Sequence, residues 1–159
     1  MDSEKKKEYT RRVAQANSTE MVVIISDIAL DYIDEAKRAF SSDTADEEGF
    51  HKAIGCIQGC IAELIESLHY EYSPAKELRS LYNFCLRRIA VSEAKKDPGI
   101  LDEVVKVLKP LRDAYDQISG ENKNGPVMGN SQTVYAGLTY GREELIENLS
   151  TNANRGYLV

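Results

Sequence analysis

The chain has 159 residues, of which 42% are hydrophobic, and this is enough apolar material for one domain with a buried core. Its formal net charge is −6 and its pI is near 5.0, which excludes nucleic acid as a main partner. The longest apolar run, residues 21–25, is too short for a signal peptide or a membrane span, so we expect no membrane insertion.

Residues 1–16 are expected to form a solvated leader that precedes the folded domain. The basic residues at 5–7 and 11–12 are interleaved with Glu4 and Glu8, which is typical of a solvated segment. An arm that binds phosphate groups or a membrane surface is the alternative for such a cluster. The interleaved acids favour the solvated leader.

The first predicted helix covers residues 17–40. Asn17 and Glu20 have the spacing of a capping box, in which a short polar side chain is followed three residues later by a glutamate. Ile24, Ile28 and Tyr32 then fall on one stripe. Because the cap and the stripe agree, we expect a helix here rather than the strand that the β-branched run at 22–25 could form.

A second helix is expected over about residues 46–70, where Thr44 and Glu47 repeat the capping spacing. At about 100° per residue, several of its apolar residues cluster within about 80° and predict the face that packs in the core. These residues are Ile54, Ile57, Ile61, Leu64 and Leu68.

Two further helices are each predicted to start at a proline in the first helical position, where the missing N–H costs nothing. Ser73 with Pro74 marks the third helix, and Asp97 with Pro98 marks the fourth. The stripe of the third is predicted to contain Leu78, Leu81, Tyr82, Cys85, Ile89 and Ser92. The stripe of the fourth is predicted to contain Ile100, Val104, Leu108, Leu111, Tyr115 and Ile118. Pro110 predicts a kink, because it removes one backbone hydrogen bond.

Short connections between the four helices favour antiparallel neighbours, so the sequence predicts an all-α, antiparallel four-helix bundle over residues 17–119. From Gly120 the chain is rich in glycine, asparagine and other polar residues, which predicts a linker. Residues 120–159 are therefore assigned to a linker and C-terminal extension, with one short helix expected at about 142–149.

The three cysteines all lie in helical patterns, and their odd number argues against a disulfide framework and favours a reducing cytoplasm. His51, Cys56 and Cys60 do not converge on one ion, because His51 lies about 140° from Cys56 on a helical wheel. A structural zinc needs four ligands, and no second pair has matching spacing. We therefore expect no metal and no cofactor, and thiols that pack in the core or at its boundary.

Phosphotransfer domains are also four-helix bundles with an exposed histidine, so a helical-bundle signalling or phosphotransfer module is the alternative function. Their pattern places Lys or Arg three residues after the histidine and Gly four residues after it. After His51, Gly55 fits, but Ile54 stands where the cation would hold the phosphoryl group. His51 and His69 are expected to be ordinary surface histidines. No other catalytic constellation is visible, so no enzyme is predicted.

Gly55 and Gly59 lie almost opposite the core face of the second helix. Glycines inside a helix cost about 1 kcal/mol each relative to alanine. Three explanations are possible. The loss of helix stability is simply tolerated, the glycines let another part of the same chain pack closely, or they form a shallow trough for a partner helix. The sequence alone leaves these alternatives open.

The third and fourth helices carry an ordered set of residues: Leu81, Tyr82, Arg87, Arg88, Asp97, Glu103, Val104, Leu111, Arg112 and Tyr115. The opening helix adds Val13, Ala16, Glu20, Asp27, Ala29 and Leu30, and the end of the second helix adds Glu63, Leu64, Ser67, Leu68 and Glu71. Together these residues resemble the FliS family of flagellar secretion chaperones. The resemblance covers about residues 9–118.

The resemblance implies a cytoplasmic, bacterial, non-enzymatic export chaperone. Members of that family bind the disordered C-terminal segment of flagellin, which wraps along apolar grooves of the bundle as short helices. They prevent premature polymerisation and assist delivery to the flagellar type III export gate. A segment that cannot bury its apolar face alone gains order on such a partner. Flagellin and the export gate are the expected partners, and a homodimer is left open.

The candidate flagellin-binding groove combines the glycine face with residues of the neighbouring helices. It comprises Gly55, Cys56, Gly59, Ile28, Tyr32, Tyr82 and Arg87. The resemblance also implies that the N-terminal segment is a mobile cover that contacts the export gate, and it assigns Tyr9 and Val13 to this role. The C-terminal extension is expected either to stay largely disordered or to fold back over the bundle's apolar surface.

Overall fold

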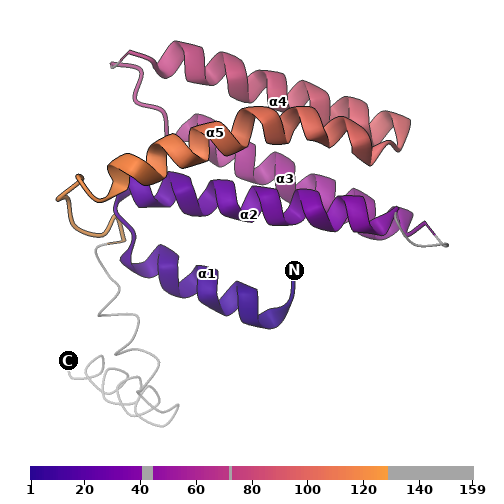
Figure 1. Ribbon diagram of the computed structural model, residues 1–159, viewed down its shortest axis with the longest axis horizontal. Helices are drawn as coiled ribbons and strands as arrows, with labels where there is room; N and C mark the ends of the chain where they lie inside the picture. The colour runs from indigo at the N-terminus through magenta and orange to yellow at the C-terminus, as the bar shows by residue number, and fades with distance from the viewer. Residues whose placement is uncertain (41–44, 72, 129–159) are drawn as a thin grey trace, which may run out of the picture. The chain divides into compact units, whose positions relative to one another are not determined.

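The computed structural model describes residues 1–40, 45–71 and 73–128, and all regular structure in these ranges is helical (Figure 1). The elements are α1 (Ser3–Gln15), α2 (Ser18–Ala39), α3 (Glu47–Glu66), α4 (Ala75–Lys95), the short 3-10 helix η1 (Pro98–Ile100) and α5 (Leu101–Ser119). Met1–Val127 form one compact unit, and Met128–Val159 form a second unit, of which only Met128 is described. Within these ranges, none of the helices combines the length and the apolar content that a membrane span requires.

Helices α2 to α5 form a four-helix bundle. Both α2 and α4 pack against α3 and α5, so each helix of the bundle has two neighbours. Lys37 near the end of α2 pairs with Asp102 at the start of α5, and Lys96 after α4 pairs with Glu47 at the start of α3. Such pairs join one helix's end to another's beginning, which confirms the predicted antiparallel all-α bundle.

The core is a single cluster of apolar side chains from all four bundle helices. Four of the five residues predicted for the core face of α3 are fully buried, namely Ile54, Ile57, Ile61 and Leu64. Leu68 lies beyond the end of α3 and is half-buried. The other members of the cluster are Ala29, Ile33, Ala36, Phe50, Ala53, Tyr82, Cys85, Ile89, Leu101, Val104 and Leu108.

The core face of α2 differs from the predicted stripe. Ala29, Ile33 and Ala36 are fully buried, whereas Ile28 and Tyr32 are only half-buried. The reason is that α2 contacts α1, α3 and α5, so apolar residues occupy a wide arc of its surface. Periodicity finds such an arc but does not show which part of it lies deepest.

The predicted starts of the first two bundle helices are largely confirmed. The Asn17 side chain accepts a hydrogen bond from the Glu20 N–H, and the Glu20 carboxylate accepts one from the Asn17 N–H, both at 2.9 Å. Helix α3 is capped by Asp46, whose carboxylate accepts from the Gly49 N–H at 2.8 Å. It ends at Glu66 rather than near residue 70. Thr44, the other proposed cap, lies outside the described residues.

The other two starts need correction. Pro74, not Ser73, precedes the first residue of α4, and no side chain caps this helix. Pro74 has φ −110° and ψ 38°, which is not a helical conformation, so the chain enters the helix one residue later than predicted. Asp97 does accept from the Gly99 N–H at 2.9 Å, but it caps η1, and α5 begins only at Leu101.

Two residues assigned to apolar stripes are exposed. Leu81 on α4 is 39% exposed and Ile118 near the end of α5 is 50% exposed, although both were expected on the core side of their helices. Pro110 lies inside α5, which continues past it to Ser119, and the bend expected there stays a prediction.

The N-terminal segment is the largest departure from the sequence analysis, because a solvated leader was expected where the structure has helix α1. Asp2 caps this helix by accepting a hydrogen bond from the Lys5 N–H at 2.8 Å. Helix α1 packs against α2 but buries none of its own residues. It therefore lies against the bundle without entering its core.

Candidate protein-binding surfaces

The glycine face of α3, defined by Gly55 and Gly59, is open. Both residues are exposed, and a Cβ built at either position would meet no atom of the described chain within 4 Å. Close packing by a neighbouring part of the described bundle is therefore wrong as an explanation of these glycines. A tolerated cost and a trough for a partner helix remain.

Tyr32 and Cys56 meet at the edge of this face. Burial, together with the nearby Cys56 thiol, raises the pKa of Tyr32 to about 12. Burial also raises the pKa of Cys60 and of Cys85 to about 11. A thiol with a raised pKa is a weak nucleophile and a weak metal ligand at neutral pH. Among the described residues, no group of three His, Cys, Asp or Glu side chains is placed to hold a metal ion.

The other predicted groove residues lie elsewhere. Ile28 is half-buried on α2, one turn before Tyr32. Tyr82 is buried in the core of the bundle and Arg87 is exposed on α4. The seven residues proposed as one groove therefore belong to different surfaces, and only the part around Tyr32 and the glycine face is brought together.

His51 faces α4 and not a phosphate-binding cation. Its Nδ1 lies 2.6 Å from a carboxylate oxygen of Glu93, and the His51 side chain is 77% exposed. A carboxylate at this distance repels a phosphoryl group on the imidazole. This geometry agrees with the missing cation at Ile54.

An apolar cavity of about 450 Å³ lies at the end of the bundle where α2 begins and α3 ends. We call it the end cavity. Its apolar walls come from Val22, Leu68, Leu78, Tyr82 and Tyr115, and Val127 lies at its border. Burial raises the pKa of both Tyr82 and Tyr115, so both phenols stay neutral at physiological pH. Most of the lining is apolar, with Glu66 and His69 also present, so the end cavity suits an apolar side chain.

The boundary between α4 and α5 continues this apolar surface. The Arg88 guanidinium donates to Glu103 at 2.6 Å, which identifies the sides of the two helices that face each other. Residues spaced by seven or by three to four along a helix share a side, so Leu81 lies on the same side of α4 as Arg88. By the same spacing, Val107, Leu111 and Ile118 lie on the Glu103 side of α5.

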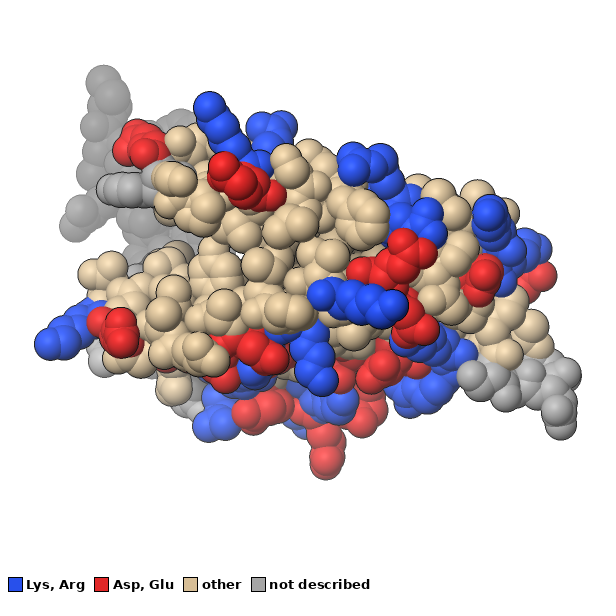
Figure 2. All heavy atoms as spheres, turned by 45° about the horizontal axis from the view of Figure 1, so that its top comes forward, with Lys and Arg blue, Asp and Glu red and all other residues tan. Residues whose placement is uncertain are grey.

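These residues define what we call the α4/α5 cleft: Leu78, Leu81, Val107, Leu111 and Ile118. Figure 2, in which the top of Figure 1 with α4 comes forward, shows an area without charged side chains over the left and middle of this face, with charged side chains above it, below it and at its right end. Arg88 and Glu103 form an ion pair at the same boundary, and Arg88 Nε is buried without a hydrogen-bond partner among the described residues.

Helix α1 is held to α2 by polar contacts, which we call the α1 clasp. Lys5 Nζ and the Tyr9 hydroxyl each donate to the Asp31 carboxylate at 2.8 Å, and Arg12 donates to Asp27 at 2.9 Å. Burial alone would raise the pKa of Asp31, but the hydrogen bonds from Lys5 and Tyr9 outweigh it, and the pKa is lowered. The amino group of Met1 also pairs with Glu35.

Asp27, a residue of α2, contacts both α1 and α5. Its second carboxylate oxygen accepts from Arg112 Nε at 2.8 Å, and Arg112 also pairs with Asp116 at 2.9 Å. The hydrogen bond with Asp27 raises the pKa of Arg112 further above its usual value. One carboxylate thus receives guanidinium groups from two helices.

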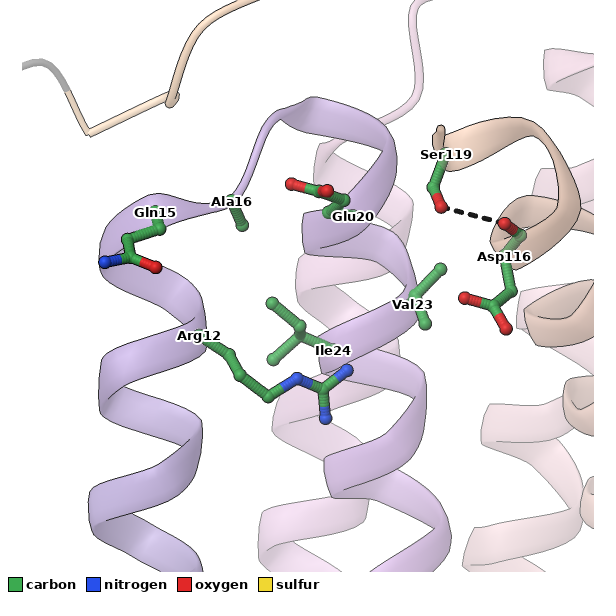
Figure 3. Close-up of a pocket in the computed structure, with 8 residues that line it drawn as sticks. All are labelled: Arg12, Gln15, Ala16, Glu20, Val23, Ile24, Asp116 and Ser119. Carbon is green, nitrogen blue, oxygen red and sulfur yellow. Dashed lines mark hydrogen bonds between the residues drawn. The ribbon is translucent and has the colours of Figure 1, made fainter. Parts of the chain in front are cut away.

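A polar hollow of about 380 Å³ separates the end of α1 from α5. Figure 3 shows Arg12 reaching from α1 across its floor of Val23 and Ile24, with Asp116 and Ser119 of α5 on the far side. Tyr9 takes part in the clasp and Val13 is half-buried on α1. Their assignment to a mobile cover that contacts the export gate stays a prediction.

The sequence analysis missed the carboxylates that receive α1 and the exposure of the α4/α5 cleft. A signal for the clasp exists: Lys5, Tyr9 and Arg12 share one side of a helix, and Asp27 and Asp31 are spaced by four. No comparable signal exists for Leu81 and Ile118. The sequence does not distinguish an exposed apolar residue from a buried one when both belong to the same helical stripe.

The described part of the chain is thus a helical bundle that leaves apolar side chains exposed along the boundary of α4 and α5, beside an apolar cavity.

The family model of the flagellar protein FliS matches residues 1–122, and the chain belongs to this family. The chain is 38% identical to the flagellar secretion chaperone FliS of Vibrio cholerae over 50 residues, which are 31% of this chain and 37% of that protein. It is 29% identical to the flagellar secretion chaperone FliSB of Pseudomonas aeruginosa over 112 residues, which are 68% of this chain and 86% of that protein. This family is a family of chaperones and not of enzymes, which decides against the phosphotransfer alternative.

Proposed function

We propose that this chaperone binds the C-terminal segment of flagellin in the cytoplasm. It prevents premature polymerisation of flagellin and assists its delivery to the flagellar type III export gate. The observation that carries the proposal is the α4/α5 cleft with its exposed Leu81 and Ile118 beside the end cavity. Such a line of apolar side chains fits the apolar face of a helix that cannot bury this face alone.

Binding in this cleft covers apolar surface on both partners. Leu81 and Ile118 keep 39% and 50% of their surface exposed in the free chaperone, so a client helix has area to bury there. The end cavity offers a recess for one larger apolar side chain of the client. Anchors of this kind, seated in a recess within a wider apolar contact, dominate the binding energy of most interfaces.

The glycine face is a second candidate site for the same client, and the export gate requires a surface of its own. Gly55 and Gly59 let a helix approach the α3 backbone closely, and Cys56 and Tyr32 line one edge. Tyr9 and Val13 on α1 are assigned to the export gate. Since α1 buries no residue, its outer side is free for such a contact.

The test is calorimetric titration with a peptide of the flagellin C-terminal segment from the same organism. The double variant Leu81→Lys with Ile118→Lys is expected to weaken binding at least about tenfold, because it places charges along the cleft. Gly59→Leu distinguishes binding on the glycine face from binding in the α4/α5 cleft, because it adds a large side chain only to α3. If this variant alone weakens binding, the client lies on the glycine face. If wild-type chaperone takes up no peptide, the proposed function is wrong.

A further inference from the structure

Residues 121–127, which we call the strap, fold back from the end of α5 onto the joint between α1 and α2. The Asn122 side-chain amide donates to Thr19 Oγ1 at 2.8 Å and to Ser18 Oγ at 3.3 Å. In return, Asn17 Nδ2 donates to the Asn122 carbonyl at 3.3 Å. The Val127 N–H donates to the Ala16 carbonyl at 3.0 Å. Residues about 105 positions apart in the chain are thus joined at one point.

The strap holds the two residues that set the direction of α1. Ala16 ends α1, and Asn17 caps α2 through the capping box, so both helices depend on this short joint. Ala16 is 1% exposed and Asn17 is 7% exposed. The Asn17 side chain makes two kinds of contact at once, since its oxygen caps α2 and its nitrogen holds the strap. Loss of the strap leaves the Ala16 carbonyl and the Asn17 side-chain nitrogen without these hydrogen-bond partners.

The strap also borders the end cavity. Val127 lines that cavity beside Tyr82 and Tyr115 but remains 60% exposed, so it forms a shallow wall and not a plug. An apolar side chain that enters the cavity from this side competes with Val127 for the same contacts. Displacing Val127 removes the N–H that holds the Ala16 carbonyl.

The other attachments of α1 do not fix its direction strongly. None of its residues is buried, and it lies on α2 through ion pairs that range from partly exposed, as Lys5 with Asp31, to partly buried, as Arg12 with Asp27. Such pairs at the surface contribute less to stability than core burial and are screened by salt. The strap adds neutral hydrogen bonds at a buried joint, where they are less affected by salt.

We propose that the strap couples the end cavity to α1. With the strap in place, the α1–α2 joint is fixed and α1 stays on α2. When an apolar side chain displaces Val127, the strap leaves the joint and α1 is released. Coupling between two sites is reciprocal, so release of α1 also loosens the strap and opens the cavity. The step that involves a client rests on the proposed function, whereas the effect of the strap on α1 does not.

The first experiment is hydrogen exchange of the full chain, read by mass spectrometry on peptides of α1, with α3 peptides as the internal reference. Asn122→Ala removes the strap's side-chain bonds and is expected to speed exchange in α1 at least about threefold, with α3 unchanged. Asn124→Ala is the matched control, because Asn124 contacts Asn122 only through its backbone N–H among the described residues. Val127→Pro removes the other donor and is expected to act like Asn122→Ala.

Equal exchange of α1 in wild type, Asn122→Ala and Val127→Pro overturns the proposal. A second measurement adds a peptide of the flagellin C-terminal segment to the wild type. Faster exchange in α1 on binding supports the coupling, and bound peptide with unchanged α1 exchange overturns it. If no peptide binds, the proposed function fails, while the comparison of variants still decides whether the strap controls α1.

Discussion

Helices α2 to α5 and helix α1 are held by different forces. The bundle is held by a core whose isoleucines and leucines are fully buried. Helix α1 contributes nothing to this core and is held by the clasp of Lys5, Tyr9 and Arg12 on two aspartates. Hydrophobic burial is not directional and resists salt, whereas exposed ion pairs are weak and screened. The two parts of one chain should therefore respond differently to the same change.

The largest difference is expected from a change in the core. Ile61→Ala removes a fully buried side chain and leaves a cavity, so the free energy of unfolding should fall by about 2–5 kcal/mol. Urea denaturation followed by circular dichroism measures this. A loss below about 1 kcal/mol would mean that the core relaxes around the cavity, and the contrast with α1 would weaken.

A smaller effect of opposite sign is expected on the glycine face. Gly59→Ala should stabilise the protein by about 0.5–1 kcal/mol, because alanine favours the helix and its Cβ meets no atom within 4 Å. Ala62→Gly on the same exposed side of α3 is the reverse control and should destabilise by a similar amount. A destabilising Gly59→Ala would show that this backbone needs glycine for a reason internal to the fold.

The smallest effect on global stability is expected from the clasp. Asp31→Ala should change the free energy of unfolding by less than about 1 kcal/mol, since Lys5 is largely exposed and Tyr9 only partly buried. It should nevertheless speed hydrogen exchange in α1. High salt should speed this exchange more in the wild type than in Asp31→Ala, where only the Arg12–Asp27 and Met1–Glu35 pairs remain to be screened. Equal salt dependence in both proteins would place the salt-sensitive contact elsewhere.

The pKa of Asp31 adds a pH dependence to the clasp. This pKa is lowered from 3.8, so the stabilising contribution is complete above 3.8 and is lost as pH falls through the lowered value. Exchange in α1, corrected for its intrinsic pH dependence, should therefore rise only in strong acid and stay constant between pH 5 and 8. A rise near neutral pH would contradict this assignment.

Much of the bundle was predictable because its signals are local. The capping box at Asn17 and the seam from Ile54 to Leu64 depend on spacing within one helix, and both are confirmed. The predicted start of α4 was wrong by one residue, because Pro74 does not have a helical conformation, which the residue types Ser73 and Pro74 do not reveal. Helix α1 was missed because its stability comes from Asp27 and Asp31, which lie on another helix.

The candidate site was harder to predict than the fold. Tyr32, Cys56 and the glycines were placed together from a helical wheel, and the structure brings Tyr32 and Cys56 into contact. Tyr82 and Arg87 were placed in the same groove, but the structure puts Tyr82 in the core and Arg87 on the exposed side of α4. Placing them correctly requires knowing which helices are neighbours in the bundle. The exposure of Leu81 and Ile118 likewise depends on how α4 and α5 pack against each other, which the sequence of one helix does not encode.

The position of α2 has a consequence for how the sequence can diverge. Helix α2 contacts α1, α3 and α5, and within it only Ser18, Asp34 and Arg38 are exposed. Nearly every substitution in α2 therefore disturbs a neighbouring helix, whereas the outer side of α3 can change without such cost. Among related chaperones with different clients, we expect α2 to vary least and the outer surfaces of α3 and α4 to carry the differences that select the client.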